Sequence, residues 1–359
     1  MPFEFVEGHN GLRRNHRSAP AAGAGTVQAV VMAAVMPQTS PSVLVIRLDA
    51  IGDALALTPL LAGLQKRAIP VDIVLRAVNA EVFSPRAVRA AYVAPFVLRS
   101  STAENRQAIA AFGARMRKNA YTHVLVATED PGGYRLARAI AAPQRIGFVN
   151  GWGKPLKTLW ARSMLTRAVV RSAGLDSKAP HESEVMWKLG ESLVDGDSIV
   201  RDVATLRPLI LDSDVLRGVH IAFQVSDKWE RLGIDFAQVV DALQAASALG
   251  TVRAIAAASE GVYAQRIADA AHLRVERYAS LRPWTAAIAG AAALVAPDSG
   301  AVHVAGMVGT PTVAVYPPIH DLDLQIARWS PWAAPYRSVS AQGAWSNEVA
   351  LSLRELLAG

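Results

Sequence analysis

The 359-residue sequence contains no cysteine. This absence excludes a disulfide framework, an iron–sulfur cluster and zinc sites built from thiolates. Aromatic residues are also scarce, at 6% of the chain, and they do not interleave with basic residues as in a groove for single-stranded nucleic acid. We therefore expect no nucleic acid among the partners of this protein.

No apolar run reaches the roughly 20 residues that are needed to span a bilayer. Residues 1–40 carry a basic stretch at Arg13, Arg14 and Arg17 and then an apolar stretch, but glycine and polar residues interrupt the latter and no clear cleavage site follows. We expect a flexible leader at 1–40. We also expect a cytoplasmic protein that touches the inner face of the cytoplasmic membrane only peripherally.

Two common phosphate-binding signatures are missing as well. No Gly-x-Gly-x-x-Gly follows the first apolar segment, and there is no Walker loop, which argues against a dinucleotide dehydrogenase or an NTPase. The Asp-x-Asp pattern occurs at Asp212/Asp214 and at Asp321/Asp323, but it is too short to be specific. The first pair lies in the expected linker between the domains, and the second lies in a polar loop after the last expected strand. We expect no metal site and no bound cofactor.

The chain is instead rich in apolar residues and in positive charge. Hydrophobic residues make up 52% of it, and 37 Lys and Arg residues stand against 30 Asp and Glu, a net charge of +7. A chain of this length and composition is expected to form two domains, each with its own core. The positive charge suits an anionic partner such as a phosphorylated substrate or a membrane surface.

Short apolar segments alternate with segments of helical periodicity. The expected strands cover residues 43–46, 71–75, 124–127, 219–223, 252–257, 293–296 and 312–316, and the expected helices include 54–67, 236–248, 263–271 and 347–357. This alternation predicts parallel strands buried on both faces and two doubly wound α/β domains, at 41–205 and 206–340. We expect the C-terminal helix within 341–359 to pack back on the first domain.

Ligands of open α/β sheets bind beyond the carboxyl ends of the strands, and two strand ends carry notable residues. After the first strand, Gly52 permits a sharp turn, and Asp53 near the helix start is either a helix cap or a functional carboxylate. After residues 293–296 come Asp298-Ser299-Gly300 and His303. The free N–H groups of that helix start favour a bound phosphate, although plain helix capping with a buried histidine remains the alternative.

Two further strand ends carry a single charged residue each. Lys228 follows residues 219–223, where its ammonium group could neutralise a phosphate or simply be solvated. Glu260 follows residues 252–257, where it could accept hydrogen bonds from ribose hydroxyls or lie on the surface.

Residues 43–61 resemble the opening strand, Gly-Asp turn and Thr-Pro helix of glycosyltransferase family 9, the ADP-heptose:lipopolysaccharide heptosyltransferases. Further similarities to the family, in the same order along the chain, occur at residues 144–148, 181–182, 297–305, 309–316 and 328–332. The likeness covers roughly residues 41–357.

The resemblance implies a GT-B architecture, in which two Rossmann-like domains face a central cleft. The N-terminal domain would bind the acceptor and the C-terminal domain a nucleotide-diphosphate sugar, with ADP-heptose as the expected co-substrate. Transfer would be inverting and metal-independent, and the acceptor would be a lipopolysaccharide core or another anionic cell-envelope glycan. The alternatives are a GT-B transferase with another donor and acceptor, and a non-catalytic nucleotide-sugar-binding protein.

Matching the motifs gives each candidate residue a role. Asp53 would be the general base that takes the proton of the acceptor hydroxyl. Lys228 and the N–H groups of Ser299 and Gly300 would hold the diphosphate and stabilise the leaving group. Asp298 and His303 would position the donor, and Glu260 would hold the ribose. The sequence departs from the family at Asp49 and at residues 128–133, which face the acceptor or the donor sugar.

Overall fold

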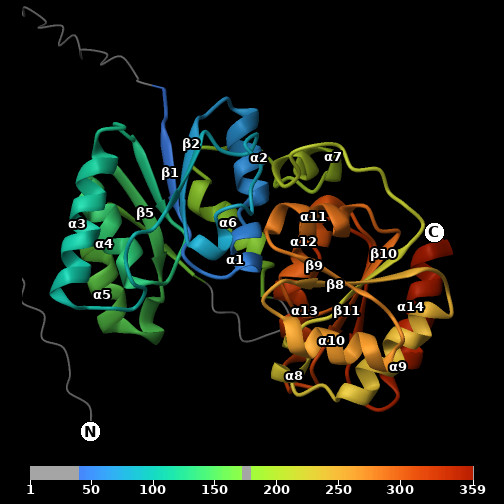
Figure 1. Cartoon of the computed structure of the whole chain (residues 1–359). Coiled ribbons are helices and arrows are strands. Elements are labelled where there is room, and N and C mark those ends of the chain that lie inside the picture. The colour runs from blue at the N-terminus through green and yellow to red at the C-terminus, as the bar shows by residue number, and fades with distance from the viewer. Residues whose placement is uncertain (1–39, 172–178, 359) are drawn as a thin grey trace, which may run out of the picture. The chain divides into compact units, whose positions relative to one another are not determined.

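The computed structural model describes residues 40–171 and 179–358, so all but the last residue of the predicted leader lies outside the described part of the chain. Ser40–Gly359 form one compact unit that contains two six-stranded parallel sheets (Figure 1). The first sheet contains β1 (Val43–Ile46), β2 (Val71–Leu75), β3 (Ala90–Val93), β4 (His123–Val126), β5 (Gln144–Val149) and β6 (Arg167–Val170). The second contains β7 (Ile221–Gln224), β8 (Val252–Ala257), β9 (Val275–Tyr278), β10 (Ala293–Pro297), β11 (Thr312–Tyr316) and β12 (Tyr336–Ser340).

Both sheets have the same strand order. The first is ordered β3-β2-β1-β4-β5-β6, and the second, read in the same direction, is ordered β9-β8-β7-β10-β11-β12. In each sheet the first strand along the chain is central, the next two strands extend the sheet to one edge, and the last three extend it to the other edge. Crevices for ligands form where this order reverses, beyond the carboxyl ends of β1 and β4 and of β7 and β10. The predicted fold class, two Rossmann-like domains in a GT-B architecture, is confirmed.

Helices cover both faces of each sheet. The first half contains α1 (Ile51–Leu55), α2 (Thr58–Lys66), η1 (Ala77–Asn79), α3 (Ala103–Arg117), α4 (Pro131–Ile140), η2 (Gly151–Gly153), α5 (Pro155–Met164) and α6 (Glu182–Gly190). The connection contains α7 (Val203–Leu206) and η3 (Arg207–Leu209). The second half contains α8 (Lys228–Arg231), α9 (Phe236–Ser247), α10 (Gly261–Ala270), α11 (Leu281–Ala289), α12 (Gly300–Val308), α13 (Leu322–Trp329) and α14 (Trp345–Ala358).

The alternation of side chains along β1 explains the layers. Leu44 and Ile46 point into the cluster under α3, α4 and α5, whereas Val43 and Val45 point into the cluster that contains α2 and α6. The latter cluster also contains residues of α11 and α12, so it is shared by the two halves. Figure 1 shows α3, α4 and α5 on the face of the first sheet that is turned away from the second sheet.

The helix expected at residues 54–67 is divided into α1 and α2. Pro59 has no N–H to donate to the carbonyl of Leu55, and the hydroxyl of Thr58 donates to that carbonyl instead, at 2.6 Å. The break ends α1 at Leu55, two residues after Asp53, so the residue predicted as a base stands on a short helix of its own.

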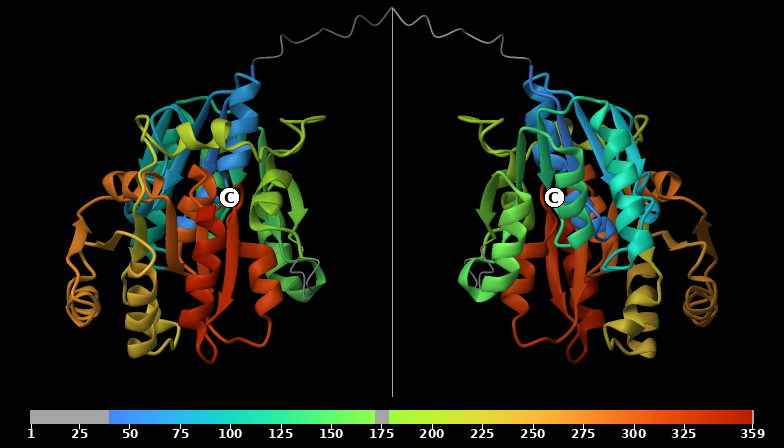
Figure 2. Two further views of the ribbon diagram at one scale, coloured as in Figure 1. Left: turned by 90° about the vertical axis from the view of Figure 1, so that its right-hand side faces the viewer. Right: turned by 90° about the vertical axis from the view of Figure 1, so that its left-hand side faces the viewer.

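The prediction that the C-terminal helix packs on the first domain is wrong. Helix α14 packs against α9 and the strands of the second sheet (Figure 2). Its apolar face, Trp345, Val349 and Leu353, is buried in the same cluster as Phe223 and Trp229. The sequence shows that this face is apolar, but two similar α/β halves offer equivalent surfaces to receive it.

Among the described residues, no helix combines the length and the apolar character that crossing a bilayer requires.

Candidate active site

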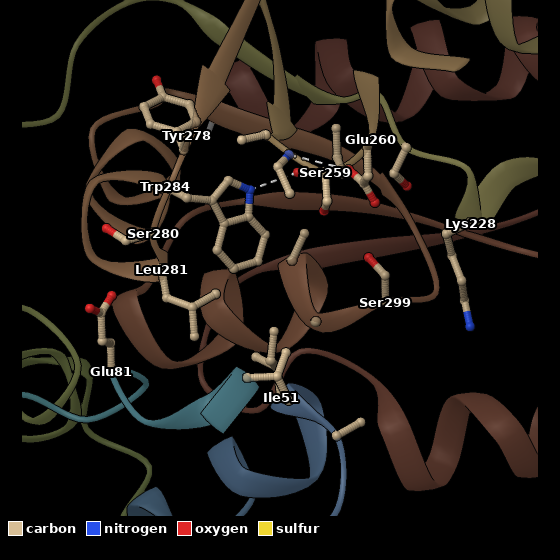
Figure 3. A pocket seen from close by; sticks show the side chains of 18 of the residues that line it. Ile51, Glu81, Lys228, Ser259, Glu260, Tyr278, Ser280, Leu281, Trp284 and Ser299 are labelled. Atoms are coloured by element: carbon tan, nitrogen blue, oxygen red, sulfur yellow. Dashed lines mark hydrogen bonds between the residues drawn. The ribbon is translucent and has the colours of Figure 1, made fainter. Parts of the chain in front are cut away.

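A cavity of about 790 Å³ is lined by segments that follow strands of both sheets (Figure 3). Its wall includes Ala50, Ile51, Gly52, Val78, Glu81, Gln224, Ser226, Lys228, Glu260, Tyr278, Leu281, Trp284, Ser299 and Gly300. Of the predicted site residues, Lys228, Glu260, Ser299 and Gly300 are therefore part of one surface. Asp53, Asp298 and His303 are not among the lining residues.

The start of α12 forms one wall of this cavity. Ser299 is the N-cap residue, with φ −157° and ψ 178°, yet its hydroxyl makes no capping hydrogen bond. That hydroxyl oxygen is shielded from solvent and has no hydrogen-bond partner among the described residues. The first N–H groups of a helix also lack intrahelical partners and attract anions. This wall therefore offers hydrogen-bond donors to a negatively charged ligand.

Lys228 approaches the same wall from the start of α8 (Figure 3). Its ammonium group belongs to none of the ion pairs found among residues 40–171 and 179–358. The next residue fixes this turn, because buried Trp229 donates its indole N–H to the Gln224 carbonyl at 2.8 Å. Ser226 contributes a second hydroxyl that is shielded from solvent and, within the described part of the chain, has no hydrogen-bond partner. The positive charge of Lys228 and these two hydroxyls can all be offered to a ligand.

Gln224 and Trp284 contribute a polar contact that the sequence does not predict. The indole N–H of Trp284 donates to Oε1 of Gln224 at 2.9 Å. Because an indole nitrogen can only donate, this contact fixes which end of the Gln224 amide faces Trp284. The amide N–H₂ group is then directed elsewhere, and both residues line the cavity.

Glu260 stands at the start of α10, where one carboxylate oxygen accepts a hydrogen bond from the Ala257 N–H at 3.2 Å. Burial raises the pKa of Glu260 to about 7, and the Ala257 N–H only partly opposes this effect. Glu260 therefore changes its charge near neutral pH, at the edge of the cavity.

Asp53 lies one residue beyond the cavity wall, on α1. Its Oδ1 accepts a hydrogen bond from the Arg47 guanidinium at 2.8 Å, and its Oδ2 accepts from the Ala50 N–H at 3.1 Å. Arg47 is 1% exposed, whereas the Asp53 side chain is 27% exposed. A buried cation thus fixes the orientation of a carboxylate that remains accessible from one side. Each carboxylate oxygen keeps a further lone pair for a substrate hydroxyl.

Arg47 belongs to a network of buried and half-buried charges that the sequence does not predict. Glu182, at the start of α6, is fully buried, and its Oε1 accepts from Arg171 at 2.6 Å and lies 3.8 Å from Arg47. Arg171 also donates to Glu129, at 2.8 Å. Arg328 of α13 approaches the other oxygen of Glu182 at 3.5 Å, so the network joins the two halves of the molecule.

Asp49 and Glu129, at the two positions that depart from the family pattern, both touch this network. Burial raises the pKa of Asp49, although Arg47 at 3.5 Å opposes the effect. Burial also acts to raise the pKa of Glu129, but Lys157 and Arg171 outweigh it and lower that pKa below its usual value. The two carboxylates beside Arg47 and Arg171 therefore differ in how readily they hold a proton.

His303 and Asp298 lie behind the cavity wall. The His303 ring packs so closely on Gly52 that a Cβ there would meet its Cδ2 at 2.3 Å. Burial lowers the pKa of His303, which favours the neutral ring at this contact between α12 and α1. Asp298 accepts a hydrogen bond from Gln325 at 2.8 Å, which ties the start of α12 to α13.

The two Asp-x-Asp pairs lie outside this cavity. Asp212 pairs with Arg282, Asp321 is the N-cap residue of α13, and Asp323 lies in the first turn of that helix. In the described part of the chain, no group of three or more His, Asp and Glu side chains is arranged to hold a metal ion.

Comparisons with known proteins agree with this geometry. The E. coli heptosyltransferase WaaC, solved with ADP, is similar over 88% of this chain and 99% of its own, with 20% identity and a TM-score of 0.65. The glycosyltransferase family 9 protein from Veillonella parvula is similar over 90% and 99%, with 17% identity and a TM-score of 0.67. A putative UDP-N-acetylglucosamine 2-epimerase from Listeria monocytogenes shares the fold at 12% identity and a TM-score of 0.54, over 89% of each chain. No curated protein matches the sequence significantly.

The model of glycosyltransferase family 9 (heptosyltransferase) matches residues 109–350, more than half of the chain. This stretch includes the segments that carry Lys228, Glu260 and the start of α12. The chain therefore belongs to glycosyltransferase family 9, the heptosyltransferase family, and is a glycosyltransferase of GT-B architecture.

Proposed function

We propose that this glycosyltransferase moves a sugar, with heptose as the expected one, from a nucleotide-diphosphate donor to a hydroxyl of a lipopolysaccharide core or another cell-envelope glycan on the cytoplasmic side. The observation that carries the proposal is the wall formed by Lys228, Ser226 and the start of α12. It combines a positive charge, two unpartnered hydroxyls and free helix N–H groups within one cavity.

The diphosphate would bind at this wall. As the bond between the anomeric carbon and the diphosphate breaks, negative charge grows on the leaving oxygen. Lys228 and the N–H groups of Ser299 and Gly300 would stabilise that charge. These donors are part of the folded chain, so the transfer is proposed to need no metal ion. Glu260 would bind the ribose, and Asp298 and His303 would hold the start of α12 in place.

Asp53 would act from the opposite side. Its accessible carboxylate would take the proton of the acceptor hydroxyl as that oxygen attacks the anomeric carbon. Attack from the side opposite to the departing diphosphate inverts the configuration at that carbon. Arg47 would keep the carboxylate aimed at the acceptor, because it holds Oδ1 at 2.8 Å.

An adenine nucleotide is the proposed carrier of the sugar. Two similar structures of the E. coli heptosyltransferase WaaC were solved with ADP and with ADP-2-deoxy-2-fluoro heptose. The cavity supports a ligand of this kind, because Trp284 and Leu281 supply apolar surface beside the polar wall. A volume of about 790 Å³ lies within the range of about 300–1,000 Å³ that is usual for ligand pockets.

A thermal-shift panel of nucleotide sugars tests the proposal. A specific donor raises the unfolding temperature by mass action, increasingly as its concentration exceeds its dissociation constant. We expect ADP-linked sugars to stabilise the protein more than UDP- or GDP-linked sugars. A panel in which no nucleotide sugar shifts the unfolding temperature would contradict a donor site in this cavity.

A further inference from the structure

Gln224, the last residue of β7, holds a side-chain amide in the wall of the cavity. The residue lines the cavity although it is only 5% exposed. Its Oε1 accepts the indole N–H of Trp284 at 2.9 Å, so the Nε2 N–H₂ group is turned away from that ring. Among residues 40–171 and 179–358, no group accepts a hydrogen bond from Nε2. Because an unpaired buried donor is costly, this amide is suited to a ligand that supplies an acceptor.

A second pair of the same two residue types shows how the protein alone completes such an amide. On α9, Oε1 of Gln238 accepts the indole N–H of Trp345 at 3.0 Å. The N–H₂ group of Gln238 then donates to the carbonyl oxygen of Gly343, also at 3.0 Å. The two pairs therefore differ in one respect. The protein supplies an acceptor for the N–H₂ group of Gln238, and within the described part of the chain it supplies none for that of Gln224.

The place of Gln224 in the second sheet directs its amide toward the proposed diphosphate wall. Strand β7 lies between β8 and β10, and the crevice of this sheet lies beyond the ends of β7 and β10. Side chains two residues apart in a strand share a face, and Ala222 belongs to the apolar cluster that contains Trp284 and Ala301. Gln224 therefore points toward the starts of α11 and α12.

Trp284, on α11, links this amide to the start of α12 (Figure 3). Its indole nitrogen donates to Gln224, while Cη2 at the other end of the ring would lie 4.0 Å from a Cβ added at Gly300, an ordinary van der Waals contact. The residue is 8% exposed, so the ring has little freedom to turn. Trp284 thus fixes the direction of the amide on the same wall as the first N–H groups of α12.

We propose that Gln224 is a further donor-binding residue, whose N–H₂ group donates to a phosphate oxygen of the nucleotide diphosphate, and that Trp284 is the positioning residue that holds this amide in its donating orientation. Because Oε1 is committed to Trp284, the amide presents only donors to a ligand, and ionised phosphate oxygens only accept. Ser226 and Lys228 line the same cavity just beyond β7, whereas Glu260, the proposed ribose ligand, follows β8. This contact rests on the proposed function, because it needs a diphosphate at that wall.

Calorimetry with ADP tests the contact without any turnover. Gln224→Met keeps the length of the side chain and removes the amide, so it should weaken ADP binding by roughly 10–100-fold, the usual effect of losing a hydrogen bond to a charged group. Gln224→Glu keeps an acceptor for the Trp284 N–H and replaces the donor by a negative charge, so it should weaken binding at least as much. Gln238→Met, the matched change in the second pair, should leave the ADP affinity unchanged. Unchanged affinity in both Gln224 variants, or an equal loss in Gln238→Met, would overturn the proposal.

A double-mutant cycle tests the positioning role of Trp284. Trp284→Phe keeps an aromatic ring and removes the N–H group, so the Gln224 amide is free to turn, and ADP binding should weaken by roughly 2–10-fold. In the Gln224→Met background the same change should have no further effect on ADP affinity, because no amide is left to orient. Trp345→Phe, its counterpart in the second pair, should leave the ADP affinity unchanged. Losses that simply add would mean that Trp284 acts through packing alone and would overturn its positioning role.

A ligand without phosphates tests which part of the nucleotide Gln224 contacts. Adenosine should bind the wild type and Gln224→Met equally, and a loss as large as that for ADP would move the contact to the nucleoside and overturn the assignment to a phosphate. The response of the wild type to ADP, UDP and GDP is measured on the same samples. A wild type that binds none of them would reject the proposed donor site and this contact with it. Wild-type binding that persists unchanged in the Gln224 variants would reject this contact alone.

Discussion

Gly52 is the point at which the contact between the two halves can be tested most sharply. A Cβ added there would come within 2.3 Å of Cδ2 and 2.8 Å of Nε2 of His303, so in Gly52→Ala the buried His303 ring, or α12 with it, must move away from α1. Overpacking of this kind costs about 1–3 kcal/mol, against about 0.5–1 kcal/mol gained by replacing glycine in a helix. Stability should therefore fall by up to about 2.5 kcal/mol.

Activity should fall further than stability. Gly52 lines the cavity and precedes Asp53, and a displacement of about 1 Å at a reacting centre can cost about 100-fold in kcat/KM. The assay compares kcat/KM and the unfolding temperature of Gly52→Ala with those of Gly250→Ala, where an added Cβ meets nothing within 4 Å. Adding His303→Ala to Gly52→Ala removes the obstructing ring and should restore the unfolding temperature. Wild-type activity and stability in Gly52→Ala would refute the packing of α12 on α1.

Three further predictions concern the cavity. Lys228→Ala should weaken ADP binding by roughly 10–100-fold, since it removes a charge-assisted contact, and calorimetry that shows unchanged affinity would contradict its role at the diphosphate. Burial raises the pKa of Glu260 from 4.5 to about 7, so the folded protein binds a proton at Glu260 more tightly than the unfolded chain does. The stability that this bound proton contributes is therefore lost as the pH rises from about 4.5 to about 7. Glu260→Gln stays neutral, so its unfolding temperature should rise relative to the wild type between about pH 5 and pH 8, and a difference independent of pH would count against the buried carboxylate. Turnover should persist in EDTA, and a strict requirement for Mg²⁺ or Mn²⁺ would contradict a diphosphate wall made of protein groups.

The central strands could be predicted because burial on both faces leaves a continuous apolar run. The expected bounds of β1, β2, β8 and β11 agree with the structure. The edge strands β3 and β6 were not predicted, since each has only four residues and none of them is fully buried, so neither leaves a long apolar run in the sequence. The edge strand β9 was not predicted either, because its charged residues Glu276 and Arg277 interrupt the apolar pattern and none of its residues is fully buried. Sheet edges therefore depend on pairing with neighbours that local sequence does not reveal.

The residues of the candidate site also fall into two groups, those that the sequence predicts and those that only the structure reveals. Lys228, Glu260 and Ser299 could be found because each lies in the loop or turn that follows a predicted strand, and parallel strand ends meet at one edge of a sheet. The Gln224–Trp284 contact could not, because its partners are 60 residues apart and neither belongs to a recognisable pattern. Glu182 gave a weak signal as part of the family likeness, but its burial beside Arg47 and Arg171 depends on tertiary packing. Charges that compensate one another across the fold are visible only in the structure.

Asp53→Asn tests the central claim, that Asp53 is the base of a metal-independent inverting transfer. The change keeps the size of the side chain and removes the group that accepts the proton. We expect turnover to fall by about 10²–10⁴-fold while the thermal-shift response to the donor is retained. An Asp53→Asn protein that binds the donor and turns over at the wild-type rate would contradict the proposed mechanism.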